Sequence, residues 1–233
     1  MKIDVVTNGE ALPCLKDLTV IVIDVLRCTT SMVTAVSNGA KAVAAFKDIE
    51  SAREFARRKG RENCILGGER KAVKIDGFDV GNSPLEYSKA NVEGKFVVMS
   101  TTNGTSAIEK AEAADTLILG AMINAGAAAK KAAEIGKDVL ILCSGTEGKQ
   151  SADDLMTAGA IIDKLKAMKD ITLTDMAIIC EHLYKSWKQG EFDITKTFHC
   201  NRLLRMGFAG DVKYCFTEDV TDCTPQFAEG IIK

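Results

Sequence analysis

Two patterns meet in the segment Ile21-Val22-Ile23-Asp24-Val25-Leu26-Arg27-Cys28-Thr29-Thr30. The β-branched run at 19–23 predicts a strand that is buried on both faces. From Thr30 onward, apolar residues recur at steps of three and four, which predicts a helix. Asp24 stands between the two, and open α/β sheets bind their ligands where a buried strand leads into a helix. An ordinary strand-to-helix connection, with Asp24 paired to Arg27, is the alternative.

Strand and helix patterns alternate along the rest of the chain. Short apolar or β-branched runs predict strands at 2–7, 42–46, 64–66, 95–100, 116–119, 138–143 and 212–216. Helical spacing predicts helices at 30–38, 49–60, 105–112, 123–134, 151–168, 174–188 and 195–206. Loops are expected at 9–16 and 71–91, and an irregular tail after 216. With 3 prolines and no linker-like composition, we expect a single domain over residues 1–233, with an α/β fold of three layers (α/β/α) and a largely parallel or mixed sheet.

Composition narrows the class of protein. Lys and Arg number 30 against 32 Asp and Glu, so the net charge predicts no nucleic-acid or membrane partner. No apolar run approaches the roughly 18 residues of a membrane span, and the N-terminus lacks the basic start and apolar core of a signal peptide. The 8 cysteines include no CxxC pair, which favours free thiols in a reducing compartment. We therefore expect a cytoplasmic protein and leave open whether it forms a homo-oligomer.

Three polar turns follow three of the predicted strands, at 24–30, 100–105 and 143–154. Because parallel strands end at the same edge of a sheet, we expect these turns to converge. Backbone N–H groups at helix starts bind anions, and hydroxyl, amide and guanidinium side chains add donors. The candidate substrate-binding residues are Arg70, Asn82, Ser83, Thr102, Asn103, Gly104, Thr105, Ser144 and Gly145.

Charges of both signs accompany these turns. Arg27 and Arg70 have the fork geometry that suits phosphate, carboxylate or sulfonate. Carboxylate oxygens are the ligands that Mg²⁺ prefers, and the candidate metal ligands are Asp24, Glu69, Asp153 and Asp154. Acids beside an anion site repel the ligand unless a cation lies between them. The pattern therefore predicts a metal-assisted reaction on a small anionic phosphorylated substrate.

Each of these features also has a structural explanation. Asp153 and Asp154 fit the first turn of a helix, where acids are favoured by the helix dipole alone. Glu69 and Arg70 fit an adjacent surface ion pair, and the turn at 101–105 fits a plain helix start. These alternatives stay open at this point.

Two further features are set apart from the site. His182 and His199 fall in predicted helices far from any motif, and we expect both to be structural. The run from Cys64 to Arg70 matches the Cys-x5-Arg spacing of cysteine phosphatases. It lacks the preceding His and the following Ser or Thr that would activate the thiol and the leaving group, so we interpret the match as a coincidence.

Five short motifs follow one another along the chain: Asp24-Val-Leu-Arg27-Cys-Thr-Thr, Gly67-Gly-Glu-Arg70, Gly77-Phe-Asp79-Val-Gly-Asn82-Ser83-Pro84, Thr101-Thr-Asn-Gly-Thr105 and Ser151-Ala-Asp-Asp154-Leu. Together, in this order and spacing, they resemble the 2-phosphosulfolactate phosphatase family, and the likeness extends to Asp211 and Pro225. The chain has Ser-Ala-Asp-Asp where the family pattern has Ser-Leu-Glu-Asp. This conservative departure leaves the chemistry expected of the family in place and leaves open whether the substrate is a close relative.

The resemblance implies a magnesium-dependent phosphatase that converts 2-phospho-3-sulfolactate to 3-sulfolactate and phosphate, a step in coenzyme M biosynthesis. The candidate catalytic residues are Asp24, Arg27, Glu69 and Asp154, and the division of metal-binding and water-activating roles among the acids is open. The alternative function is a non-catalytic binder of small phosphorylated or sulfonated acids. The carboxylate cluster argues against it, because a pure anion binder should avoid acids beside its ligand.

Overall fold

The computed structural model describes residues 1–7 and 11–233, so the loop predicted at 9–16 lies partly outside the described residues. The strands are β1 Lys2–Thr7, β2 Leu18–Ile23, β3 Ala42–Ala45, β4 Cys64–Arg70, β5 Val73–Lys74, β6 Phe96–Ser100, β7 Thr116–Gly120, β8 Asp138–Cys143, β9 Thr172–Leu173, β10 Gln226–Ala228 and β11 Ile231–Ile232. The α-helices are α1 Cys28–Ser37, α2 Ile49–Lys59, α3 Lys89–Val92, α4 Gly104–Ala111, α5 Ala125–Ile135, α6 Ala152–Lys166, α7 Asp175–Lys188, α8 Phe198–Arg205 and α9 Ala209–Cys215. Each strand predicted before residue 200 is confirmed.

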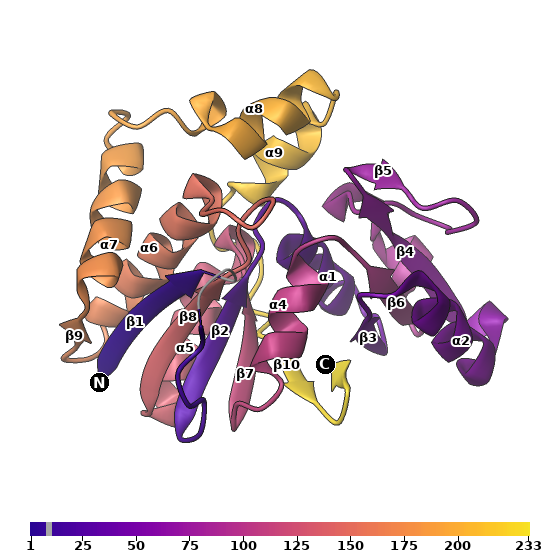
Figure 1. Cartoon of the computed structure of the whole chain (residues 1–233), viewed down its shortest axis with the longest axis horizontal. Helices are drawn as coiled ribbons and strands as arrows, with labels where there is room; N and C mark the ends of the chain where they lie inside the picture. Colours follow the sequence, from indigo (N-terminus) through magenta and orange to yellow (C-terminus); the bar gives the residue numbers. More distant parts are fainter. Residues whose placement is uncertain (8–10) are drawn as a thin grey trace.

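The described strands form a mixed sheet in the order β5-β4-β6-β3-β11-β10-β7-β2-β8-β1-β9. β2 lies between β7 and β8 and is parallel to both, and β3, β6 and β4 form a second parallel group. The C-terminal strands β10 and β11 pair antiparallel with β7 and β3. They thereby join the two parallel groups, as the chain end beside β10 shows in Figure 1.

Helices cover both faces of the sheet, because successive side chains of a buried strand point to opposite faces. On β2, Ile21 and Ile23 pack with α5, α6 and α7. Val20 and Val22 point the other way and pack with α1 and α4. The prediction of a three-layer α/β fold with a mixed sheet is confirmed.

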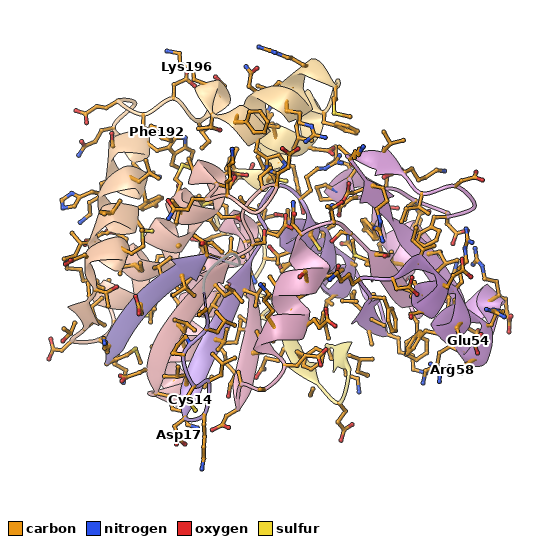
Figure 2. All side chains as sticks on the ribbon, viewed as in Figure 1. Cys14, Asp17, Glu54, Arg58, Phe192 and Lys196 are labelled. Atoms are coloured by element: carbon orange, nitrogen blue, oxygen red, sulfur yellow. The ribbon has the colours of Figure 1, made fainter. Side chains whose placement is uncertain are left out.

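Helix α2 shows how the sequence pattern places one of these layers. Ala52 and Ala56 lie on its buried side, against β4 and β6. The side chain of Asp48 caps its first turn by accepting the N–H of Ser51 at 2.7 Å. Glu54 and Arg58 point outward from the same helix (Figure 2), so α2 has the amphipathic character that its spacing predicts.

The C-terminal third differs from the prediction. The strand predicted at 212–216 is wrong, because these residues belong to helix α9. Val212 and Cys215 are buried three residues apart, which puts them on one face of a helix. The tail is not irregular throughout, since it forms β10 and β11. Strand β4 also runs four residues beyond the predicted end, to Arg70, and the loop at 71–91 contains β5, a short 3₁₀ turn and α3.

All 8 cysteines are free thiols, as their spacing predicts. Among the described residues, none of the helices has both the length and the apolar character that crossing a membrane would require.

Candidate active site

A cavity of about 340 Å³ lies at the ends of β2 and β4, next to α8. All three predicted turns contribute to its wall: Asp24 and Arg27 follow β2, Thr102 and Asn103 follow β6, and Thr146 follows β8. Strand β6 is several strands away from β2 in the sheet. Helix α4 nevertheless lies against β2, and Figure 1 shows it between the two strand groups, so its first turn reaches the same cavity.

Asp24 faces this cavity with one carboxylate oxygen unbonded. Its Oδ1 accepts the N–H of Cys28 at 3.1 Å, and its own N–H donates to Oγ1 of Thr29 at 3.0 Å, which holds the start of α1 against the end of β2. Its Oδ2 has no hydrogen-bond partner among the described residues. Burial raises the pKa of Asp24 to about 6; the Cys28 N–H opposes the rise and neighbouring carboxylates add to it.

The start of α4 approaches Asp24 closely because residue 104 is glycine. A Cβ at Gly104 would lie 2.7 Å from Oδ2 of Asp24 and 2.6 Å from Cβ of Cys28. The residue before the helix, Asn103, makes no side-chain cap hydrogen bond. Oγ1 of Thr101 accepts the N–H of Thr105 at 3.4 Å, and the first turn of α4 still brings a partial positive charge to this part of the site.

The other residues of this turn divide into two groups. Thr102 and Asn103 line the cavity, and no hydrogen-bond partner of the Asn103 amide is found in the described part of the chain. Thr105 does not line it, because its hydroxyl donates to the carbonyl of Thr101 at 2.9 Å. In this position Thr105 stabilises the helix start, and its predicted binding of substrate stays a prediction.

Glu69 lines the cavity, but both of its oxygens are hydrogen-bonded. Oε1 accepts the N–H and the hydroxyl of Thr102, each at 2.9 Å, and Oε2 accepts the N–H of Ala72 at 2.6 Å. Glu69 therefore ties the turn after β4 to the turn before α4. It adds negative charge to the site without offering a free oxygen.

Asp154 lies behind the cavity wall. Its Oδ1 accepts the N–H of Val25 at 2.9 Å, and its Oδ2 accepts the N–H of Gly145 at 2.9 Å and the hydroxyl of Ser144 at 3.1 Å. Burial, followed by the charge of Asp153, raises the pKa of Asp154 well above its usual range. Asp154, Ser144 and Gly145 do not line the cavity, because these groups satisfy one another and join two turns, and their predicted catalytic, metal-binding and substrate-binding roles stay predictions.

Arg27 is paired with Asp211 of α9 and not with Asp24. Its Nη1 lies 2.6 Å from Oδ2 of Asp211, and its guanidinium lies over the ring of Phe208, 4.0 Å from the centroid. The hydroxyl of Ser83 donates to Oδ1 of Asp211 at 2.7 Å. Arg27 still lines the cavity, whereas Ser83, predicted to bind substrate, supports the ion pair behind it.

Arg70, predicted to bind substrate, does not line the cavity. Its guanidinium donates to the carbonyls of Glu69 and Lys47 and to the hydroxyl of Ser100. Glu69 and Arg70 are consecutive residues of β4, so their side chains point to opposite faces and only one can reach the site. Two cations that the sequence analysis missed line the cavity instead, Lys71 and Arg202.

Asn82 lines the cavity with an unsatisfied amide. It is 6% exposed, and its Oδ1 is buried without a hydrogen-bond partner among the described residues. Leaving such a group unpaired costs about 1–3 kcal/mol. The unpaired atom is an acceptor, so it suits a hydroxyl group or a water and not a phosphate oxygen, and substrate binding by Asn82 stays a prediction.

His199 was expected to be structural and remote from the motifs; its place in the structure is at the cavity. Its Nδ1 lies 3.1 Å from Oδ2 of Asp153 and 3.0 Å from Oγ1 of Thr146. Burial lowers the pKa of His199, but the hydrogen bond and charge of Asp153 outweigh it, so the pKa is raised. Only the fold could reveal this contact, because Asp153 and His199 are 46 residues apart. His182 is exposed on α7.

Cys64 does not resemble the nucleophile of a cysteine phosphatase. It is buried between α2 and β4, where its thiol donates to the carbonyl of Ala56 at 3.8 Å. Burial raises the pKa of the Cys64 thiol, which disfavours the reactive thiolate. It also does not line the cavity.

The four predicted metal ligands differ in how far their oxygens are already hydrogen-bonded. No group of three or more His, Cys, Asp or Glu in the described chain is placed to hold a metal ion. Glu69, Asp153 and Asp154 have both oxygens hydrogen-bonded, whereas Asp24 has one oxygen without a partner among the described residues, and metal binding by these four acids stays a prediction. One or two carboxylates, with substrate phosphate and water, are sufficient for Mg²⁺ in phosphoryl-transfer sites. Asp24, with a free oxygen and acidic neighbours, fits that pattern.

Comparison with known proteins gives a consistent result. The sequence profile of the 2-phosphosulpholactate phosphatase family matches residues 7–230. A protein of Caldanaerobacter subterraneus subsp. tengcongensis is 42% identical over 220 residues, which cover 94% of this chain and 91% of that protein. One of Clostridium tetani is 40% identical over the full length of both chains, and one of Clostridium perfringens strain SM101 is 43% identical over 100% of this chain and 96% of its own. Each of the three is named a probable 2-phosphosulfolactate phosphatase.

Proposed function

This chain belongs to the 2-phosphosulfolactate phosphatase family, and on that premise we propose that it is a phosphatase that hydrolyses 2-phospho-3-sulfolactate to 3-sulfolactate and phosphate with the aid of Mg²⁺. The reaction would serve coenzyme M biosynthesis, and residues 1–233 would act as one catalytic domain. The observation that carries the proposal is Asp24, a buried carboxylate that lines the cavity beside the start of α4 and whose Oδ2 has no hydrogen-bond partner among the described residues.

The phosphate group is bound at the start of α4. Backbone N–H groups there and the amides of Asn82 and Asn103 supply neutral donors to its oxygens. Lys71 and Arg202 lie on the same cavity wall and supply positive charge for the carboxylate and sulfonate of the substrate. A substrate with three acidic groups thus meets donors on more than one side.

Asp24 would hold Mg²⁺, since its Oδ2 has no hydrogen-bond partner among the described residues. When bound, the ion neutralises phosphate charge and lowers the barrier to attack by water. Arg27, fixed by Asp211, adds a buried positive charge to the cavity wall. Glu69 keeps the turns after β4 and β6 in register around the phosphate.

Phosphate release from 2-phospho-3-sulfolactate, measured with Mg²⁺ and with EDTA, tests this function. We expect release with Mg²⁺ and little or none with EDTA, restored when Mg²⁺ is added back. Equal release in both would overturn the metal dependence. Tight binding of the substrate without release in either condition would overturn the phosphatase and favour the non-catalytic binder.

A further inference from the structure

The hydrogen-bond network around His199 fixes which of its ring nitrogens carries a proton. The Thr146 hydroxyl donates its one proton to Oγ of Ser151 at 3.2 Å, and the Ser151 hydroxyl in turn donates to Oδ1 of Asp153. Nδ1 of His199 lies within hydrogen-bond distance of Thr146 Oγ1 and of Asp153 Oδ2. The Thr146 hydroxyl has already donated its proton to Ser151, and the Asp153 carboxylate can only accept. Nδ1 of His199 is therefore the donor to both.

With Nδ1 engaged in these two contacts, Nε2 is the nitrogen of His199 that is left to react. Nε2 has no hydrogen-bond partner among the described residues, and the His199 side chain is 16% exposed while it lines the cavity with Asp24. Asp153, which holds the ring from behind, is 1% exposed. A buried carboxylate thus orients an imidazole whose second nitrogen can exchange a proton in the cavity, the arrangement of a general acid or base.

We propose that His199 is the general acid of the phosphatase reaction, giving the proton on Nε2 to the oxygen that leaves phosphorus, with Asp153 as its positioning residue. The inference rests on the proposed function and assigns the proton donor, which the sequence motifs do not contain. The bond between phosphorus and the C2 oxygen of the substrate breaks, and its electron pair stays on that oxygen. The oxygen takes the proton from Nε2 and leaves as an alcohol. Water forms the new bond to phosphorus, and the proton it loses to solvent balances the one that later returns to Nε2.

The charges around His199 favour the protonated ring that this role requires. Charged groups of several elements lie around His199. They are Asp153 of α6, Asp24 after β2, Glu147 after β8, Arg202 of α8, and Glu69 and Lys71 at the end of β4. Burial, the largest influence, and Arg202 lower the pKa of His199, but it is raised overall; the hydrogen bond and charge of Asp153 are the main causes of the rise, and the smaller contribution of Asp24 would be offset when Mg²⁺ is bound there. Glu147 also pairs with Arg202 at 2.8 Å, so the charges of these two residues offset each other.

A general acid matters most when the leaving oxygen is a poor leaving group. The secondary alcohol of phosphosulfolactate needs a proton in order to leave, whereas nitrophenolate leaves p-nitrophenyl phosphate without one. His199→Gln should therefore lower kcat on 2-phospho-3-sulfolactate by about 10²-fold or more and affect p-nitrophenyl phosphate far less. His182→Gln, an exposed residue on α7, is the matched control and should leave both rates unchanged.

The pH profile of kcat with 2-phospho-3-sulfolactate gives a second, independent readout. The wild type should lose activity on the alkaline side as His199 deprotonates, and His199→Gln should lack that limb. Asp153→Asn should shift the limb to lower pH by about one unit, because it removes the charge that favours the imidazolium. Added imidazole should restore part of the activity of His199→Ala.

The outcomes separate this inference from the proposed function. If the wild type releases phosphate but the alkaline limb persists unchanged in His199→Gln and Asp153→Asn, His199 is not the acid, and the phosphatase proposal stands. An equal loss on both substrates by a folded His199→Gln would also overturn the inference. If the wild type releases no phosphate from 2-phospho-3-sulfolactate, the proposed function itself fails.

Discussion

Asp24 and Asp154 are both buried acids at turns that follow neighbouring parallel strands, yet their surroundings differ. Asp154 accepts hydrogen bonds from Val25, Ser144 and Gly145 and has no oxygen left for a ligand. Asp24 accepts one bond, from Cys28, and turns its other oxygen to the cavity. The pKa of both acids is raised, and burial is the largest cause in each.

The difference teaches that burial and position at the sheet edge are not sufficient to identify a functional acid. What separates the two residues is whether backbone donors have already satisfied the carboxylate. The hydrogen bonds of Asp154 join the turn after β2 to the turn after β8. Asp24 is held by a single bond, so a cation or substrate can still compete for its free oxygen.

The largest expected effect is on catalysis by Asp24→Asn. The amide removes the charge that would hold Mg²⁺ but keeps the acceptor for the Cys28 N–H. We expect kcat to fall by about 10³-fold, or roughly 4 kcal/mol, with the fold intact by circular dichroism. Wild-type turnover by this variant would remove Asp24 from the site.

The second effect is the pH dependence of stability that Asp24 causes, measured in the presence of EDTA. The pKa of Asp24 is about 6 in the folded protein against an ordinary value of 3.8, so the folded state binds this proton more tightly than the unfolded state. The stabilisation is complete below about pH 4 and is lost as the pH rises through 6, a loss of about 3 kcal/mol. Asp24→Asn should therefore become more stable relative to the wild type over this range.

Urea unfolding at pH 4, 5, 6 and 7 measures that difference, because the other titrating groups are common to both proteins. A difference that does not change with pH would contradict the burial of a charge at Asp24. Activity and stability should thus move in opposite directions at this residue, as they do where function requires a buried charge.

The third effect is expected for Asp154→Asn, which should lower stability and leave activity nearly unchanged, the opposite of Asp24→Asn. An amide there turns a donor toward Val25 N–H or toward Gly145 N–H and leaves one buried group without an acceptor. We expect a loss of about 2 kcal/mol in unfolding free energy, seen as a lower urea midpoint at pH 4, where the buried charge that raises the pKa of Asp154 does not contribute. Activity per folded molecule should stay within about threefold of the wild type. A kcat loss as large as that of Asp24→Asn, in protein shown to be folded, would erase the distinction between the two acids.

The smallest effect is expected at Arg70. Its guanidinium bonds to the carbonyls of Glu69 and Lys47 on the side away from the cavity. Arg70→Ala should change KM for 2-phospho-3-sulfolactate by less than about threefold, since no substrate contact is lost. A large rise in KM with kcat unchanged would show that Arg70 binds the substrate after all.

The sequence contains enough to find the parts of the site that depend on local pattern. Asp24 could be predicted because a β-branched strand ends beside it and a helix begins shortly after. Asn103 and Gly104 could be predicted because they occupy a polar turn at the next such junction. The layers of the fold follow from the same strand and helix periods.

Other parts depend on contacts that no local pattern contains. The Asp153–His199 contact spans 46 residues and the Arg27–Asp211 pair spans 184. The outward direction of Arg70 follows only from knowing that β4 continues through both Glu69 and Arg70.

The C-terminal elements were misjudged for a related reason. Apart from Lys213, the residues at 212–216 are apolar or aromatic, as in a strand, and the three-residue spacing of Val212 and Cys215 favours a helix. Strands β10 and β11 have 3 and 2 residues, too few to show an alternating pattern. Their pairing with β7 and β3 decides their conformation.

A crystal structure with Mg²⁺ and phosphate bound tests the central claim most directly, because it shows which acid contacts the metal. We expect the ion beside Oδ2 of Asp24 and the phosphate at the start of α4, with Asp154 still bonded to Val25 and Gly145. A metal ion bound by Asp154 in place of these backbone groups, or bound outside this cavity, would contradict the account.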